Sequence, residues 1–427
     1  MFDIKLIREQ PEMVKENLKK RHNPEILKMV DQLIENDKKW REKVAEINKL
    51  RQKRNEISLE IAKLKKAGKP ADKKLKEAAK IPEEIKKLEK EVADFEEKNK
   101  NFLMKIPNLL HETVPYGKDE SENVEIKKWG KPPKFDFKPK NHLEILEGLG
   151  MIDIDRAAKI AGHGFYYLKD DAVLLDLAIQ RLALELLRSR GFTIIEPPFM
   201  MKRKPYEGVV DLSDFENVMY KVENEDLYMI ATSEHPMIGS HMDEVFDKKE
   251  LPVRWAGVSA CFRKEVGAHG KYTKGLFRVH QFNKVEQIVF CLPEQSWKIL
   301  EELQKNAEDL YQALGLHYRV VNVCTGDIGI IAAKKYDTEV WMADGQYREI
   351  GSNSNCTDYQ ARRLNIKFKE GEGKAPAGFV HTLNNTALAT SRTMLAILEQ
   401  FQQKDGSVKI PDSLVPYMSG IKVLKKK

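Results

Sequence analysis

The sequence predicts an α+β protein with a long antiparallel α-helical coiled coil at its N-terminus and a mainly antiparallel β-sheet flanked by helices after it. Three observations predict this class. Apolar residues recur at alternating spacings of three and four through much of the first hundred residues. Short segments rich in β-branched and aromatic residues then follow, without a regular βαβ rhythm. The composition, 41% hydrophobic and 33% charged, is typical of a folded protein with a charged surface.

The 427 residues suffice for two or three domains. No apolar run approaches the ~20 residues of a membrane-spanning helix. The N-terminal segment is amphipathic and carries acidic residues, unlike a signal or transit peptide. We therefore expect a cytoplasmic protein without a membrane partner. Four cysteines, none in a CxxC pair, predict buried or incidental thiols rather than a zinc site or a disulfide framework; they are Cys261, Cys291, Cys324 and Cys356.

The predicted coiled-coil arm covers about residues 27–103. Its two helices, of roughly 40 and 30 residues, are separated by "AGKPAD" (67–72), where Gly68 and Pro70 end the pattern. At ~1.5 Å per residue the arm would extend for about 50–60 Å. Pro82 predicts a local kink in the second helix. The apolar stripe comprises Val30, Leu33, Trp40, Val44, Ile47, Ile57, Ile61, Leu64, Ala78, Ile81, Ile85, Leu88, Val92 and Phe95.

The positive charge of the chain is concentrated in this arm. Residues 38–100 contain 21 Lys and Arg against 13 Asp and Glu, which gives this segment a net charge of +8. Since the whole chain has a net charge of +7, all other residues together carry −1. Such charge on a coiled coil is often only its solvated face. A long arm with a basic end also suits phosphate contacts, and without a groove-reading motif it favours recognition of RNA shape over DNA sequence. The lysines at the tip are Lys63, Lys65, Lys66, Lys69, Lys73, Lys74 and Lys76.

The sequence divides into residues 1–106, a Pro-, Gly- and charge-rich linker over 107–140, and a second domain over 141–427. In that domain an apolar helix (170–191) leads into the strand "FTIIEPPFM" (192–200). This pair, closed by Pro197 and Pro198, is a candidate subunit contact, although taken alone it could be an ordinary helix–strand unit.

Two arginines, Arg263 and Arg278, flank a cationic loop between two predicted strands. The positive charge of this hairpin has three possible partners: a nucleotide, a nucleic acid or simply the solvent. The chain has neither a GxxxxGK[ST] loop nor a GxGxxG between a strand and a helix. Any ATP would therefore be bound by arginines and a metal ion on the surface of a sheet.

Five segments, in this order, resemble those of seryl-tRNA synthetases, which are class II aminoacyl-tRNA synthetases. They are "GFTIIEPPF", "IATSEHP", "FRKE…GLFRVHQFNKVE", "YREIGSNSNCTDYQARR" and "LNNTALATSRTMLAILE". With the basic arm, the resemblance covers essentially the whole chain. It implies a class II catalytic domain, a homodimer with Pro197 and Pro198 at its interface, and a serine–tRNA ligase that uses ATP and Mg²⁺. It also implies L-serine and serine tRNA as substrates, selenocysteine tRNA where the host has one, and tRNA contacts by the arm.

The resemblance implies that Arg263 and Arg392 are catalytic, because arginines hold the reacting α-phosphate and the far end of the triphosphate. Glu349 and Ser352 would hold Mg²⁺, which prefers oxygen ligands. The implied ATP-binding residues are Arg263, Lys264, Glu265, Arg278, Val279, Phe282, Glu349, Ile350, Gly351, Ser352 and Arg392. The implied serine-binding residues are Thr232, Ser233, Glu234, Glu286 and Thr386.

One residue departs from the family pattern: Asn385 stands where glycine is common, and asparagine is the next residue to tolerate a positive φ. Two other functions compete with the ligase. A non-catalytic paralogue that binds RNA or protein would be expected to have lost one of the two arginines of the hairpin. A class II ligase for threonine or proline would be expected to carry an anticodon-binding domain, but only about 35 residues follow Arg392.

Overall fold

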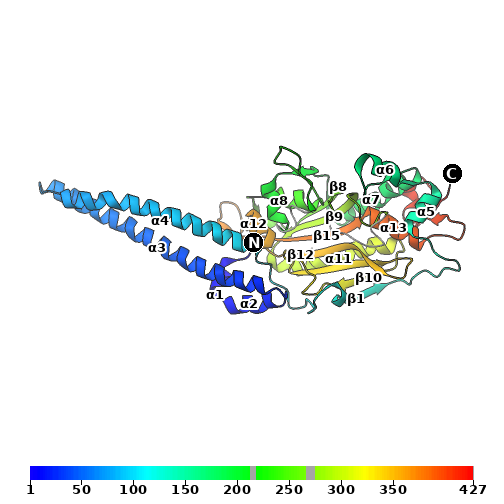
Figure 1. The fold of residues 1–427 in the computed structure, drawn as a ribbon, viewed down its shortest axis with the longest axis horizontal. Coiled ribbons are helices and arrows are strands. Elements are labelled where there is room, and N and C mark those ends of the chain that lie inside the picture. Colours follow the sequence, from blue (N-terminus) through cyan, green and yellow to red (C-terminus); the bar gives the residue numbers. More distant parts are fainter. Residues whose placement is uncertain (212–217, 266–274, 427) are drawn as a thin grey trace. The chain divides into compact units, whose positions relative to one another are not determined.

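The computed structural model describes residues 1–211, 218–265 and 275–426, and it forms two compact units, Met1–Pro107 and Asn108–Lys427 (Figure 1). Most of the cationic loop predicted between Arg263 and Arg278 (266–274) lies outside the described residues.

The N-terminal unit is entirely helical and contains the predicted arm. Its helices are α1 (Ile4–Glu9), α2 (Pro11–Lys19), α3 (Pro24–Lys66) and α4 (Asp72–Lys105). Asn23 caps α3 by accepting a hydrogen bond from Glu25 N–H, and Pro24 occupies the first turn, where its missing donor costs nothing. α4 is continuous through Pro82.

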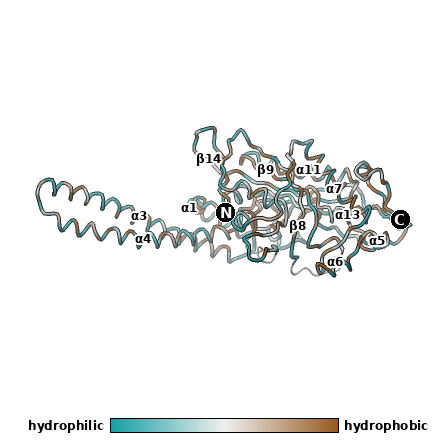
Figure 2. The backbone as a smooth tube through the Cα atoms, turned by 90° about the horizontal axis from the view of Figure 1, so that it is seen from above, coloured by the Kyte–Doolittle hydropathy of each residue, from teal (hydrophilic) through white to brown (hydrophobic). Residues whose placement is uncertain are grey.

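Apolar residues from both arm helices pack into one buried seam. Both helices are largely hydrophilic with recurring hydrophobic positions (Figure 2). Ion pairs flank the seam: Arg51 Nη2 lies 2.9 Å from Glu89 Oε1, and Lys53 Nζ lies 2.8 Å from Glu77 Oε1. These exposed pairs help to fix the register of the helices more than they stabilise them. The buried members of the seam are Ile47, Ile57, Ile81, Ile85 and Leu88.

The C-terminal unit is built on an eight-stranded sheet of order β1-β10-β11-β12-β15-β9-β8-β4. Its pairings are antiparallel except for β4–β8, which confirms the mainly antiparallel sheet. The strands are β1 (Val124–Trp129), β4 (Thr193–Ile195), β8 (Val253–Phe262), β9 (Gln281–Cys291), β10 (Tyr318–Asn322), β11 (Lys334–Trp341), β12 (Tyr347–Asn355) and β15 (His381–Ala389).

Helices cover the sheet, and short strands form small additional sheets. The helices are α5 (His142–Leu149), α6 (Ile154–Ala161), α7 (Asp171–Ser189), α8 (Arg203–Val209), α10 (Glu234–Gly239), α11 (Ser296–Ala313), α12 (Tyr359–Leu364) and α13 (Thr390–Gln400), with 3₁₀ turns η1 (Glu120–Glu122), η2 (Lys248–Glu250), η4 (Pro293–Gln295) and η5 (Val415–Met418). The short strands are β2 (Ile152–Asp153), β3 (Tyr167–Leu168), β5 (Met200–Met201), β6 (Tyr228–Met229), β7 (Val245–Asp247), β13 (Lys367–Lys369), β14 (Pro376–Phe379), β16 (Val408–Lys409) and β17 (Val423–Leu424).

The main hydrophobic core lies between the sheet and helices α7, α11 and α13. Along β9, one set of side chains enters this core and the alternate set points to the opposite face of the sheet. Val285 and Val289 are completely buried in this core. Because side chains alternate along a strand, Phe282, Lys284 and Glu286 project from the opposite face of the sheet. The functional side chains therefore stand on a rigid, well-packed support.

The structure differs from the sequence-based expectations in two places. The expected linker 107–140 includes β1, which pairs with β10 at one edge of the sheet. Asn385 does not have a positive φ but lies in β15 opposite Gln287, from whose amide it accepts a 2.7 Å hydrogen bond.

All four cysteines are buried and free. No helix in the described ranges is long and apolar enough to cross a membrane.

Candidate active site

A cavity of about 400 Å³ opens over β9, β12, β15 and the start of α13, beside the end of β8. It brings together residues that the sequence had placed in four separate segments. Of the predicted site residues, those that line it are Thr232, Glu234, Arg263, Glu265, Val279, Phe282, Glu286, Glu349, Ile350, Gly351, Ser352, Thr386 and Arg392.

Arg263 follows the end of β8, and its guanidinium lies over the ring of Phe282 on β9, 5.2 Å from the centroid. Its backbone N–H donates to the carbonyl of His280 (2.9 Å), and its Nε donates to that of Ala231 (3.4 Å). The cation is thus held on an aromatic face, with donors left to point into the cavity.

Arg392 lies in the first turn of α13, across the cavity floor. Its Nη1 donates to the carbonyl of Glu349 (2.9 Å), and its guanidinium lies 4.7 Å from the centroid of the Phe277 ring. Burial lowers the pKa of Arg392 from its usual high value, and the carboxylate of Glu349 opposes this shift. The arginine remains a cation, because its ordinary pKa lies far above neutrality.

The side chain of Glu349 on β12 is 45% exposed, so its carboxylate can reach water in the cavity although protein atoms surround it. Burial alone would raise the pKa of this carboxyl, but Arg392, Lys335 and a hydrogen bond from Ser352 Oγ (3.1 Å) outweigh it and lower the pKa to about 2. Asp337 lies opposite Ser352 on β11 and is buried. Burial and the neighbouring Glu349 raise the pKa of Asp337, and the ammonium of Lys335, 2.9 Å from Asp337 Oδ2, opposes this shift.

The other end of the cavity is a small polar pocket with two carboxylates. Glu286 is 1% exposed, pairs with the ammonium of Lys284, and accepts a hydrogen bond from Thr386 Oγ1 (3.3 Å). Burial and the proximity of Glu286 raise the pKa of Glu234 to about 7. Thr232 is buried beside it, where its Oγ1 accepts from Glu234 N–H (3.2 Å).

Three predicted site residues do not line the cavity. Ser233 is completely buried, and its Oγ donates to the carbonyl of Gly257 (3.4 Å) on β8. Lys264 donates its backbone N–H to Val218 (3.0 Å). Arg278 is largely exposed, and its Nη1 lies 3.5 Å from Glu265 Oε2.

Sequence reasoning missed several lining residues. Lys284 looks like an ordinary lysine of an alternating strand, and only the cavity explains its burial. Asn384 donates to Glu234 Oε1 (3.2 Å), and its alternation with Thr386 along the strand was an available signal. His235 and Phe277 also line the cavity, although nothing in the sequence distinguishes either of them from an ordinary core residue.

Comparisons with known proteins show the family to which the chain is related. The model of the class II tRNA synthetase core domain, of the group for G, H, P, S and T, matches residues 219–401, which contain the whole cavity floor. This match defines a class II aminoacyl-tRNA synthetase core. The model of the seryl-tRNA synthetase N-terminal domain matches residues 1–110.

Full-length relatives agree with both matches. The serine–tRNA ligase of Methanocella arvoryzae is 55% identical over 425 residues, covering 99% of this chain and 100% of the relative. The crystal structure of seryl-tRNA synthetase from Pyrococcus horikoshii complexed with ATP has a TM-score of 0.97 and 49% identity, with 100% of both chains covered. That of the cytoplasmic serine–tRNA ligase from Naegleria fowleri in complex with AMP has a TM-score of 0.92 and 37% identity over 100% of this chain and 99% of the other. This chain therefore belongs to the seryl-tRNA synthetase family.

Proposed function

We propose that this chain activates L-serine with ATP and transfers the seryl group to the 3′ end of serine tRNA. The observation that carries the proposal is one cavity with arginines at one end and a pocket of buried carboxylates at the other. The first end suits a triphosphate and the second suits the ammonium group of an amino acid. Every matched position has a competent residue, so the non-catalytic paralogue is not favoured.

In the first step a carboxylate oxygen of serine attacks the α-phosphorus of ATP, and pyrophosphate leaves. The nucleophile belongs to the substrate, so the protein aligns the reactants and neutralises phosphate charge. Arg263 suits the α-phosphate beside the serine carboxylate, and Phe282 below it offers a face for adenine. Arg392 would lie near the γ-phosphate. Glu265 precedes the loop and Arg278 follows it; Glu265 would contact the base, and Arg278 would contact the bent triphosphate.

Glu349 and Ser352 would hold the Mg²⁺ that accompanies ATP. The donor set fits, because a carboxylate with a pKa near 2 and a hydroxyl are hard oxygen ligands. When bound, the ion would neutralise phosphate charge.

Serine would bind with its ammonium group between Glu234 and Glu286 and its hydroxyl at Thr386. A substrate without the hydroxyl would leave these buried polar groups without a partner, which discriminates against alanine. In the second step a hydroxyl of the terminal adenosine attacks the carbonyl carbon of seryl-adenylate, and AMP leaves.

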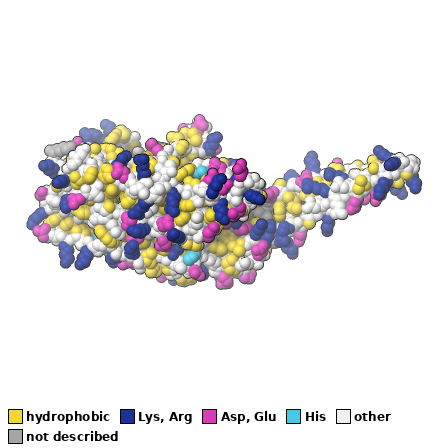
Figure 3. All heavy atoms as spheres, turned by 180° about the vertical axis from the view of Figure 1, so that it is seen from behind, with side chains coloured by type: hydrophobic (Ala, Val, Ile, Leu, Met, Phe, Trp, Pro, Cys, Tyr) yellow, Lys and Arg dark blue, Asp and Glu magenta, His cyan; other side chains and the backbone are white. Residues whose placement is uncertain are grey.

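The arm would bind the tRNA through its basic end. Figure 3 shows Lys and Arg side chains along the arm, with Asp and Glu between them. At the tip, Lys74 is paired with Glu60 (2.8 Å), which leaves fewer free charges than the sequence suggested. Within the described part of the chain no carboxylate lies within 4.0 Å of the other tip ammonium groups, those of Lys63, Lys65, Lys66, Lys69, Lys73 and Lys76. Selenocysteine tRNA would be a further substrate where the host has one, and we expect the enzyme to act in the cytoplasm.

The chain would act as a homodimer through α7 and β4. β4 is the edge strand of the sheet next to β8, and Ile194 on it is 40% exposed. Leu174 and Leu177 on the outer face of α7 are 37% and 55% exposed. Pro197 and Pro198 follow directly after β4. A second copy of the same surface would cover both the open strand edge and the apolar side chains.

ATP–pyrophosphate exchange without tRNA, measured in parallel with serine, threonine and alanine, tests the activity. Exchange with serine alone is expected, and no exchange with any of them from a folded dimer would refute the proposal. Replacing residues 38–100 by a short turn should abolish tRNA charging and spare exchange. If charging survives, the arm does not bind the tRNA.

A further inference from the structure

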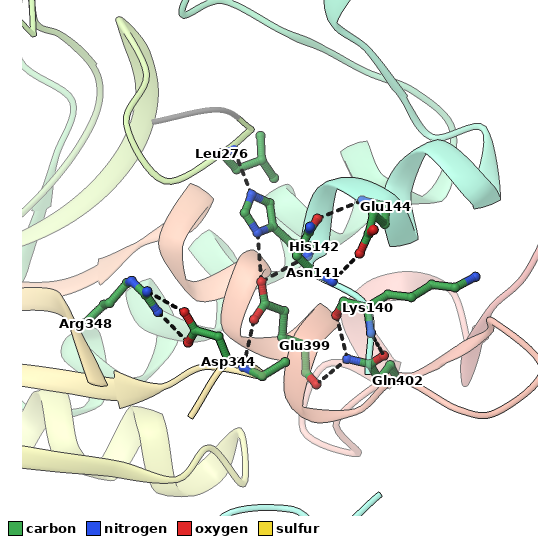
Figure 4. A network of polar contacts seen from close by, with 10 residues as sticks. Lys140, Asn141, His142, Glu144, Leu276, Asp344, Arg348, Glu399 and Gln402 are labelled. Atoms are coloured by element: carbon green, nitrogen blue, oxygen red, sulfur yellow. Dashed lines mark hydrogen bonds and ion pairs between the residues drawn. The ribbon is translucent and has the colours of Figure 1, made fainter. Parts of the chain in front are cut away.

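Behind the cavity, a buried histidine connects the end of the cationic hairpin to helix α13 (Figure 4). His142, the first residue of α5, is 2% exposed, and Glu399 near the end of α13 is completely buried. His142 Nε2 accepts a hydrogen bond from Leu276 N–H (3.2 Å). The proton of the neutral ring therefore lies on Nδ1, which donates to Glu399 Oε1 (2.9 Å).

Glu399 is surrounded by donors. Besides the imidazole, its Oε1 accepts from His142 N–H (3.0 Å), and its Oε2 accepts from Ala343 N–H (2.9 Å). Each of these three groups donates to Glu399, and an ionised carboxylate can only accept. Ala343 lies in the turn between β11 and β12, so Glu399 holds three separate segments at one point.

Leu276 is the residue through which this contact reaches the active site. Before it, Gly275 has φ of +88°, and a Cβ there would overlap the imidazole of His142. After it, Phe277 lies in the cavity wall, and its carbonyl accepts from Arg392 Nε (3.4 Å). Arg392 and Glu399 are seven residues apart on α13 and thus lie on nearly the same side of the helix. Both ends of α13 are consequently joined to the same short stretch of the hairpin.

We propose that His142 and Glu399 are positioning residues that hold Leu276 and Phe277, and through them Arg392, in the geometry that binds ATP. The inference rests on the proposed function, because it concerns the ATP end of the same cavity. Neither residue lines the cavity, so both act through the hairpin backbone. In the described part of the chain the side chains of Glu234, Glu286 and Thr386 contact Gln360, Asn384, Lys284 and one another, so we expect the serine end to be independent of His142 and Glu399.

Two substitutions of His142 distinguish its hydrogen bond to Leu276 from its hydrogen bond to Glu399. His142→Gln places an amide oxygen near the position of Nε2, where it accepts from Leu276 N–H. His142→Asn keeps a donor toward Glu399 but has no atom that reaches Leu276. In ATP–pyrophosphate exchange we expect the KM for ATP to rise about tenfold in His142→Asn, the size of effect that a lost buried hydrogen bond produces. The KM for serine should stay within about twofold, and His142→Gln should recover most of the ATP affinity.

Gln402→Ala is the matched control. Gln402 follows α13 and binds the backbone of Lys140, just before α5, through bonds of 2.7 and 2.9 Å. Its amide also donates to the backbone carbonyl of Glu399 (3.0 Å), but it takes no part in the bonds from His142 to Leu276 and to the carboxylate of Glu399. This variant should lower the melting temperature without changing either KM. The proposal is overturned if His142→Asn loses stability but keeps its KM for ATP, or if both KM values rise together. Failure of the proposed function would look different, because the unmodified protein would then show no serine-dependent exchange.

Discussion

The raised pKa of Glu234 gives a prediction that connects serine binding to pH. Burial and the neighbouring Glu286 raise this pKa to about 7, whereas a carboxyl in the unfolded chain titrates near 4.5. The ionised fraction of Glu234 is then about a tenth at pH 6, a half at pH 7 and nine tenths at pH 8. Only the ionised form attracts the ammonium group of serine. We expect kcat/KM for serine to rise about tenfold from pH 6 to pH 8 and to level off above.

The same shift predicts the sign of an effect on stability. Because the folded state binds this proton more tightly than the unfolded state does, the associated stabilisation is complete below pH 4.5 and is lost as the pH rises through 7. The difference of the two pKa values corresponds to at most about 3 kcal/mol. Glu234→Gln has no charge to bury. It should therefore unfold at higher urea than the wild type at pH 8 in the absence of serine, with a smaller gain at pH 5.

The assay is serine-dependent pyrophosphate exchange at saturating ATP over pH 6 to 8, beside urea unfolding of both proteins. Glu234→Gln should lose most of its serine affinity and show no inflection near pH 7. A flat wild-type profile over this range would refute the argument. So would a glutamine variant that is no more stable than the wild type at pH 8, because the buried charge would then cost nothing.

Three further predictions concern other parts of the molecule. Arg263→Lys keeps the charge but loses the planar pair of donors, so exchange should fall roughly a hundredfold at normal stability. Lys284→Met leaves Glu286 buried without its cation and should lower the free energy of unfolding by about 3 kcal/mol at pH 8, as measured in urea. Leu177→Asp should convert the proposed dimer to a monomer in sedimentation, while Val245→Asp, at another exposed apolar residue, on β7, should leave the proposed dimer intact.

The arm could be predicted almost completely because its determinants are local. An apolar residue at every third or fourth position defines a helix, and Gly68 ends the first helix wherever the rest of the chain lies. The breaks fell within a few residues of the observed ends of α3 and α4. Pro82 did not interrupt α4, because the helix is anchored on both sides by buried Ile81 and Ile85.

The C-terminal sheet could be predicted as a class but not as an order of strands. β15 lies between β12 and β9, and no local pattern encodes a pairing between segments about a hundred residues apart. Asn385 shows the consequence. Its departure from glycine suggested a left-handed backbone, but the neighbouring strand supplies Gln287, whose amide gives the asparagine side chain a buried partner. Only the tertiary structure reveals that reason.

The two ends of the cavity differ in how firmly their charges are held. At the phosphate end, Arg392 Nη1 lies 3.8 Å from the carboxylate of Glu349, and Arg278 Nη1 lies 3.5 Å from that of Glu265. These separations are longer than a good hydrogen bond, and both carboxylates reach water. A phosphate can therefore replace the carboxylate as the partner of either arginine with little loss of free energy. At the other end, Lys284 and Glu286 are in direct contact and buried, and they cannot separate without leaving a charge unpaired. In the proposed function the rigid end would distinguish serine from amino acids that differ by a single group, whereas the looser end would admit a flexible triphosphate and release the pyrophosphate formed from it.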